Sequence, residues 1–335
     1  MRLLVLGGTH HVGRAVVETA LARGDEVTTL NRGVSRPPTP DTQALVADRT
    51  DHEAVRAALG GQEWDAAIDT WAGAPRAVRD AARLLADRVG HYGYVSSHGV
   101  YQWPWPSGAD ERAPLVTGDP GSDDGKDYAA AKRGAELAVL EAFGDRALLA
   151  RSGGIIGPYE DVGRIPWWMR RIERGGRVLA PGRPETPLQF IDARDIAVWM
   201  LSAADRGLGG AFNVNSRPAS TTMGELLHTL AEVLGSDAEL VWADSGLLER
   251  EGLMLGMEFG LRYPGYPSPT GIHDADTSAA HAAGLVCRPL RETLADTWAW
   301  LRTEGDPRQP AGTPPMGSWS DTAAERRVLD LLTAS

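Results

Sequence analysis

The chain has 335 residues, of which 42% are hydrophobic, and this suffices for one large domain or two closely joined ones. Its formal net charge of -11 opposes nucleic acid, and no apolar run reaches the roughly 18 residues of a membrane span, so we expect neither partner. A single cysteine excludes a disulfide framework. The apolar stretch at the start of the chain is too short for a signal peptide, so we expect a cytoplasmic protein.

The chain opens with an apolar run from Leu3 to Leu6, a glycine turn and a helical pattern from Val12 to Arg23. This order predicts a buried parallel strand, a tight turn and a helix. Glycines let the backbone approach a ligand closely, and the amides at a helix N-terminus bind a pyrophosphate. We therefore expect a dinucleotide on the turn, which comprises Gly7, Gly8, Thr9, His10, His11, Val12 and Gly13.

The second predicted strand, which starts at Glu26, ends in Asn31 and Arg32. In dinucleotide-binding folds an acidic residue at this point receives the hydroxyls of the adenosine ribose. Asn31 lacks that charge and Arg32 adds a positive one, an environment suited to the extra phosphate of NADP. We therefore expect NADP, with NAD as the second choice. The competing interpretation is that Arg32 is simply exposed.

Two further strand ends point to the same edge of the predicted sheet. One strand ends in Thr70, Trp71 and Ala72, which we expect to line the cofactor cleft, although Trp71 is equally suited to the core. A later apolar strand, starting at Gly93, ends in two serines and a glycine turn. Because ligands of open α/β sheets bind at the carboxyl ends of the strands, these residues belong to a candidate site.

Tyr128 and Lys132 lie four positions apart in a segment of strong helix formers from Asp127 to Phe143, so they share one helical face. A lysine ammonium beside a tyrosine lowers the tyrosine pKa from its usual value near 10. The phenol then exchanges a proton with a carbonyl or alcohol oxygen more readily. Such a pair alone occurs on many surface helices, and its weight here comes from the other motifs.

The glycine turn, the Ser-Ser-x-x-Val-Tyr strand end and the Tyr-x-x-x-Lys helix together resemble an extended short-chain dehydrogenase/reductase of the NAD-dependent epimerase/dehydratase family, in its atypical branch. The resemblance covers nearly the whole chain. It implies that Ser97 is the catalytic hydroxyl, that Tyr128 is the acid/base, and that Lys132 is its partner and holds the nicotinamide ribose. It also implies an adenine contact at Asp48, with Arg49 beside it.

Departures from the family pattern narrow the expected substrate. Leu188 stands where sugar-nucleotide epimerases carry a phosphate-binding arginine, which disfavours sugar nucleotides unless Arg183 or Arg164 supplies the anchor. His98 and Gly99 replace the acidic pair of the dehydratases, so we do not expect sugar dehydration. For substrate contact we expect His98, Trp103 and Gln189, with loop packing as the competing role of Trp103; we expect no metal site.

The predicted fold is α/β, a Rossmann-type doubly wound parallel sheet with a smaller, mixed α/β C-terminal substrate domain. We assign residues 1–158 and 190–216 to the cofactor domain, and 159–189 and 217–335 to the substrate part. Helical patterns cover Thr222 to Leu234, Leu290 to Arg302 and Asp321 to Leu332. We expect Asp195 to cap a helix ending near Ala204, Cys287 to be an inert hydrophobe among helix residues, and the tail 305–319 to be extended.

These motifs predict an NADP-dependent oxidoreductase that acts on a carbonyl or secondary alcohol of a small organic molecule through Ser97, Tyr128 and Lys132. Two alternatives stay open. In the first, the same residues serve an epimerase that retains NAD(P) and acts on a sugar-like substrate. In the second, the protein is a non-catalytic sensor that binds NADP. The resemblance also allows a homodimer.

Overall fold

The computed structural model describes residues 1–34, 36–253, 273–305 and 322–333. Within them, a seven-stranded sheet has the strand order β11-β6-β5-β4-β1-β2-β3, and every neighbouring pair is parallel. The order reverses beside β1, and this switch point is where an open α/β sheet binds its ligand. The strands are β1 Arg2–Leu6, β2 Glu26–Asn31, β3 Gln43–Val46, β4 Trp64–Asp69, β5 Val89–Ser97, β6 Ala147–Ser152 and β11 Gly210–Val214.

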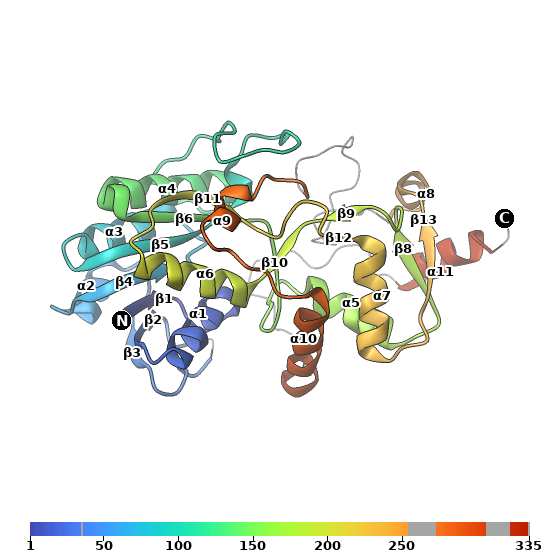
Figure 1. Ribbon diagram of the computed structural model, residues 1–335, viewed down its shortest axis with the longest axis horizontal. Coiled ribbons are helices and arrows are strands. Elements are labelled where there is room, and N and C mark those ends of the chain that lie inside the picture. The colour runs from blue at the N-terminus through green and yellow to red at the C-terminus, as the bar shows by residue number, and fades with distance from the viewer. Residues whose placement is uncertain (35, 254–272, 306–321, 334–335) are drawn as a thin grey trace.

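Helices cover both faces of this sheet (Figure 1). One face packs against α1 and α6, and the other against α2, α3 and α4, with a separate apolar cluster on each side. The helices are α1 His11–Ala22, α2 His52–Leu59, α3 Pro75–Leu85, α4 Tyr128–Phe143 and α6 Ala193–Asp205, and the short 3-10 turns are η1 His98–Val100 and η2 Gly144–Arg146. The predicted doubly wound parallel sheet is confirmed.

A third apolar cluster belongs to the opposite end of the molecule, drawn on the right of Figure 1. Trp168, Leu227 and Leu301 lie at its centre with little or no exposed surface. The elements are β7 Gly154–Ile156, α5 Arg164–Glu173, β8 Arg177–Pro181, β9 Pro187–Leu188, β10 Phe190–Asp192, β12 Thr221–Thr222, α7 Met223–Leu234, β13 Glu239–Ala243, α8 Ser245–Arg250, α10 Leu290–Glu304 and α11 Thr322–Leu331. Strands pair as β7 with β10 and β8 with β13, both parallel, and β9 with β12, antiparallel.

Local sequence explains several helix starts. The Asp127 carboxylate accepts a hydrogen bond from Ala130 N, so α4 begins at Tyr128. Thr222 and Glu225 form a reciprocal capping box at α7, where the predicted helix Thr222 to Leu234 is found. The prediction for α6 was wrong in its cap. Asp192 caps that helix by accepting from Arg194 N, whereas Asp195 lies in the first turn and accepts from Arg288 N at 2.9 Å.

One further expectation is corrected. Cys287 lies in the coil between α9 (Ser278–Ala282) and α10, not in a helix, and burial raises the pKa of its thiol to about 12. In addition, α9 packs on the sheet rather than on the third cluster, because Ala280 and Leu285 join the apolar cluster beneath α6. The predicted extended tail, 305–319, lies almost wholly outside the described residues.

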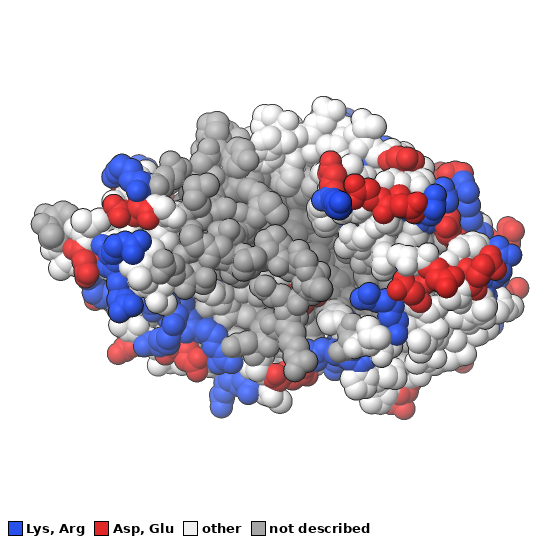
Figure 2. Space-filling model, turned by 180° about the vertical axis from the view of Figure 1, so that it is seen from behind, with Lys and Arg blue, Asp and Glu red and all other residues white. Residues whose placement is uncertain are grey.

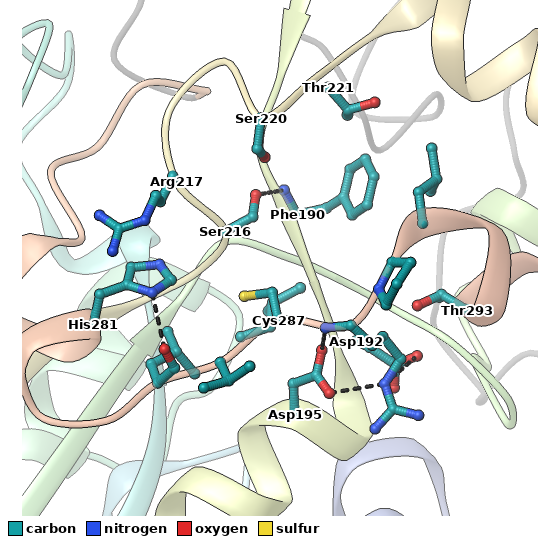
Figure 3. A pocket seen from close by; sticks show the side chains of 16 residues that line it. Phe190, Asp192, Asp195, Ser216, Arg217, Ser220, Thr221, His281, Cys287 and Thr293 are labelled. Carbon is teal, nitrogen blue, oxygen red and sulfur yellow. Dashed lines mark hydrogen bonds and ion pairs between the residues drawn. The ribbon is translucent and has the colours of Figure 1, made fainter.

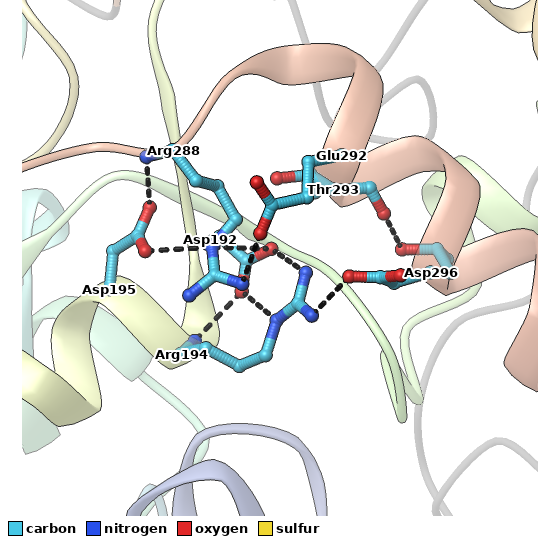
Figure 4. A network of polar contacts seen from close by, with 8 residues as sticks. Asp192, Arg194, Asp195, Arg288, Glu292, Thr293 and Asp296 are labelled. Carbon is cyan, nitrogen blue, oxygen red and sulfur yellow. Dashed lines mark hydrogen bonds and ion pairs between the residues drawn. The ribbon is translucent and has the colours of Figure 1, made fainter. Parts of the chain in front are cut away.

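An ion-pair network ties the start of α6 to the start of α10 (Figure 4). Arg194 contacts Asp192 at 2.7 Å and Asp296 at 2.5 Å, and Arg288 contacts Asp195 at 2.8 Å. This network joins the helix that follows β10 to the C-terminal part of the chain.

Acidic and basic side chains are interspersed on the face drawn in Figure 2. None of the described helices is long and apolar enough to cross a membrane.

Candidate active site

The glycine turn after β1 requires glycine for steric reasons. Gly7 has a φ of +128°, and a Cβ atom there would lie 2.4 Å from Thr70 Oγ1. A Cβ on Gly13 would lie 2.7 Å from Gly8 N, so the first turn of α1 packs directly on the strand-to-helix loop. No side chain caps α1 and its first turn has no acid, which leaves the positive helix end available to an anion. The turn therefore fits the pyrophosphate of a dinucleotide.

The other residues of the turn differ in their surroundings. Thr9 and His10 are half-buried, and His10 Nδ1 lies 3.9 Å from Asp161 Oδ2. Val12 is buried. Burial lowers the pKa of His11, whose backbone φ is +30° and whose Nε2 has no hydrogen-bond partner among the described residues. The His11 imidazole is therefore neutral at pH 7 and forms part of the wall between the turn and residues 156–164.

The end of β2 lies beside this turn. Asn31 Nδ2 donates to Gly7 O at 3.5 Å, and Asn31 Oδ1 accepts from Gly33 N at 2.9 Å, so this side chain braces the turn. Arg32 is exposed and its charge acts on both His10 and Asp48, in each case to lower the pKa. The hydrogen bonds from Thr50 N and Oγ1 are the main causes of the lowered Asp48 pKa.

Arg49 lies deeper than its neighbour. Its side chain is almost fully buried and forms a bidentate pair with Asp69, at 3.1 and 2.8 Å. Asp69 also accepts from Tyr92 Oη at 2.7 Å and from Trp71 N at 2.9 Å. The Arg49 guanidinium is therefore engaged with β4, and a cofactor contact would fall to its backbone. Sequence reasoning missed Asp69, although it ends an apolar strand directly before the predicted cleft residues.

Thr70, Trp71 and Ala72 follow β4 into the loop beside the turn. Thr70 Oγ1 donates to Leu6 O at 3.3 Å, and Ala72 is exposed. The Trp71 indole donates to Ala74 O at 2.9 Å, while the Trp71 carbonyl accepts from Tyr94 Oη at 3.0 Å and Lys132 Nζ at 2.9 Å. This carbonyl connects the predicted cofactor loop to the predicted catalytic lysine.

Ser97 and Tyr128 meet at the carboxyl end of β5. The Ser97 hydroxyl acts on the Tyr128 phenol to lower its pKa, and Ser97 Oγ accepts from Gly99 N at 3.0 Å. A Cβ on Gly99 would lie 3.3 Å from Ser97 Oγ and 3.4 Å from the Tyr128 ring, so a small residue is needed here. Tyr128 keeps 49% of its surface exposed. The phenol therefore stands at an open site with its serine already in place.

Lys132 lies one helical turn behind Tyr128 and is 4% exposed. Its Nζ donates to Trp71 O at 2.9 Å and to Val95 O at 2.8 Å, and lies 5.9 Å from the centre of the Tyr128 ring. Burial lowers the pKa of the ammonium to about 8, although the charges of Asp69 and Glu136 oppose this shift. The two carbonyls fix the lysine directly behind the Ser97–Tyr128 pair.

The expected lowering of the Tyr128 pKa by Lys132 is not what the structure gives. The pKa of Tyr128 is raised, because the protein atoms crowded around the cleft displace water from the phenolic oxygen even though half of the ring surface remains accessible. The Ser97 hydroxyl and the charge of Arg164 oppose the rise. Arg164 leads α5 and pairs with Glu160 at 3.2 Å.

The three predicted substrate contacts are placed differently from one another. His98 is 2% exposed, lies edge-on to Trp105, and has a pKa lowered to about 4 by burial, so its imidazole is neutral. Trp103 is 42% exposed and packs on Trp105 with ring centres 5.5 Å apart. Gln189 is buried, and its amide Nε2 donates to two backbone carbonyls, Ser216 O and Ala275 O. Trp103 is thus the most accessible of the three.

Comparison with known proteins agrees with this geometry. The model of the NAD dependent epimerase/dehydratase family matches residues 3–215. The chain is 32% identical over 254 residues to a 3-diazoavenalumate denitrifying reductase of a Streptomyces species, which covers 69% of this chain and 82% of that protein. It is 25% identical to sterol demethylase protein B of Methylococcus capsulatus, over 91% of this chain and 99% of that one.

Solved structures share the fold. The Bordetella bronchiseptica enzyme WbmH in complex with NAD+ superposes with a TM-score of 0.70 at 19% identity, covering 91% of this chain and 99% of that one. The Thermus thermophilus UDP-glucose 4-epimerase complex with NAD gives 0.64 at 20% identity, covering 91% and 100%. The chain belongs to the NAD-dependent epimerase/dehydratase family, and it is an enzyme of this kind.

Proposed function

We propose that this enzyme is an NADP-dependent oxidoreductase that transfers hydride to or from a carbonyl or secondary alcohol carbon of a small organic molecule. The observation that carries the proposal is that Ser97 Oγ and the Tyr128 ring both lie against Gly99 at the end of β5, with Lys132 held behind them by two backbone carbonyls. When bound, NADPH would supply the hydride in the reducing direction, and NADP would accept it in the oxidising direction. The substrate oxygen would lie against the two hydroxyl groups.

Each residue has a distinct part in the reducing direction. Ser97 orients the carbonyl oxygen, and Tyr128 gives its proton to the oxygen as negative charge develops there. Because the Tyr128 pKa is raised, the phenol is protonated at pH 7 and ready to act as the acid. Lys132 stabilises the phenolate that remains. In the oxidising direction the same groups work in reverse, with Tyr128 as the base.

The cofactor side of the proposal rests on the turn and on the end of β2. The positive end of α1 would receive the pyrophosphate, and Asn31 holds the turn in shape. Arg32 is exposed and therefore accessible to the 2′-phosphate of NADP. No acid takes the place of Asn31 to favour NAD. We retain the adenine contact at Asp48 as part of the proposal.

The substrate side favours a ring-shaped or apolar molecule. Trp103 and Trp105 form an aromatic wall next to η1, with Trp103 partly exposed. The similarity to a protein named as a reductase supports a reductase over an isomerising enzyme. The epimerase alternative is favoured by the family's structures with bound NAD, and it predicts no net consumption of cofactor. The sensor alternative gives no role to the placement of Ser97, Tyr128 and Lys132 around one strand end.

A panel of aromatic and aliphatic carbonyl compounds tests the proposal, with purified protein and NADPH and with oxidation of the reduced nicotinamide as the readout. For a compound that is turned over, Tyr128→Phe and Ser97→Ala should each lower kcat by about 10²–10⁴-fold while NADPH affinity changes little. Ser202→Ala, on α6 away from the site, is the matched control and should leave kcat unchanged. Full turnover in Tyr128→Phe would refute the mechanism.

A further inference from the structure

A cavity of about 470 Å³ lies between β10, α6 and the segment that leads into α10 (Figure 3). It is bounded by β10, the start of α6, the loop 216–221 and the segment 281–293. Neither the glycine turn nor Ser97, Tyr128 or Lys132 lines it. Its volume is within the range of about 300–1,000 Å³ that is usual for small-molecule sites. The cavity is thus large enough for a small metabolite of its own.

One side of this cavity is apolar and incompletely covered. Phe190 and Ile191 form its inner wall and are nearly buried. Val286 also lines the cavity, with 77% of its surface exposed, and so do Pro289 and Leu290. An exposed aliphatic side chain beside a cavity gains free energy when a ligand covers it. The apolar part of a ligand would therefore lie on this side.

The carboxylates of the cavity are already neutralised. Asp192 is 3% exposed and pairs with Arg194 at 2.7 Å, and Asp195 is 6% exposed and pairs with Arg288 at 2.8 Å (Figure 4). Arg288 also lies 3.6 Å from Asp192, so both buried acids contact an arginine. These pairs leave no charge on this wall for a ligand to neutralise.

Arg217 is the cationic group that remains. It lines the edge of the cavity, and its exposed guanidinium has no hydrogen-bond or ion-pair partner in the part of the chain that the structure describes. The Ser220 hydroxyl lines the same edge, and Ser220 N donates to Arg217 O at 3.2 Å, so one turn presents both groups. The charge of Arg217 acts on two other residues that line the cavity, since it opposes the rise in the Cys287 pKa and adds to the lowering of the His281 pKa.

We propose that this cavity binds a small organic carboxylate whose anionic group pairs with Arg217 and Ser220 and whose apolar body covers Phe190 and Val286. A guanidinium binds a carboxylate with directed hydrogen bonds, and the apolar side accounts for the rest of the ligand. The site is independent of the proposed hydride transfer, since no proposed catalytic residue takes part in it.

The first experiment measures binding of 3-phenylpropanoate to the full chain by saturation-transfer NMR, with 3-phenylpropylammonium as the isosteric cation. We expect saturable binding of the carboxylate and none of the ammonium. Arg217→Gln should weaken the carboxylate by about tenfold, which is about 1.4 kcal/mol. Arg2→Gln, which removes an exposed arginine far away on β1, is the matched control and should have no effect.

The place of binding is tested with Cys287, the single cysteine of the chain, which lines the cavity. Bound 3-phenylpropanoate should slow its reaction with methyl methanethiosulfonate at alkaline pH, with the same concentration dependence as the NMR signal. Urea-unfolded protein, labelled in full, calibrates the rate. Four results would each overturn the proposal: no saturable binding, equal binding of the ammonium, unchanged affinity in Arg217→Gln, or binding that leaves Cys287 unprotected and is displaced by NADPH.

Discussion

Asp69→Asn is the substitution from which the structure predicts the largest loss of stability near the site. The Asp69 carboxylate is fully buried and forms a bidentate pair with Arg49, which is itself 5% exposed. The asparagine would keep a similar shape but would leave the guanidinium buried without a countercharge. Breaking a buried ion pair on one side costs about 3–5 kcal/mol, and we expect that loss in the free energy of unfolding.

The chain offers a matched control for this prediction. Arg76 and Asp123 form an ion pair at 2.8 Å, the same distance as the closest Arg49–Asp69 contact, but their side chains are 49% and 67% exposed. Asp123→Asn should therefore cost at most about 1 kcal/mol. Urea unfolding at pH 7, followed by circular dichroism, measures both losses. Equal small losses in the two variants would refute the argument from burial.

The same substitution has a pH signature and a partner that should rescue it. Because the pKa of Asp69 is lowered in the folded chain, its stabilisation is present above the unfolded value near 4 and is lost as the pH falls further. The Asn variant should lack this part of the acid sensitivity. The double variant Arg49→Met with Asp69→Asn removes the unpaired cation and should recover most of the lost stability.

Three further predictions concern the catalytic lysine, the cofactor and the cap of α7. The pKa of Lys132 is lowered to about 8, so the ammonium is charged below that pH and kcat should fall as the pH rises through about 8. The variant Lys132→Arg stays charged and should lack that decline. An identical decline in this variant would assign the titration to another group. Arg32→Ala should weaken NADPH by more than NADH in calorimetric titration, whereas equal losses would make Arg32 a surface residue only. Thr222→Ala should lower the free energy of unfolding by about 1 kcal/mol, measured by urea unfolding, because it removes the capping box of α7.

The sequence predicts the fold from local patterns, and the resemblance to the family predicts that Ser97 works with Tyr128. A strand, a glycine turn and a helix are read from consecutive residues, and parallel strands bring their carboxyl ends to one edge. The placement of Tyr128 and Lys132 on one face follows from their spacing in a helix alone. These features depend on neighbours in the chain, so one sequence contains the information.

Other features depend on residues that are distant in the sequence. The pairing of Arg49 with Asp69 places a buried cation where the sequence suggests a cofactor contact. The Tyr128 pKa depends on how closely several elements crowd the cleft, which no spacing reveals. Likewise, Asp195 looks like a helix cap in the sequence, and only the return of Arg288 from the C-terminal part explains its position.

The most direct test of the central claim is calorimetric titration of the purified, cofactor-stripped protein with NADPH, NADP, NADH and NAD, after the isolated protein has been examined for bound nucleotide. The account predicts that NADPH binds tightly, exchanges freely and binds more tightly than NADH. Nucleotide that stays bound through purification would favour the epimerase. Absence of binding by all four dinucleotides would contradict the account.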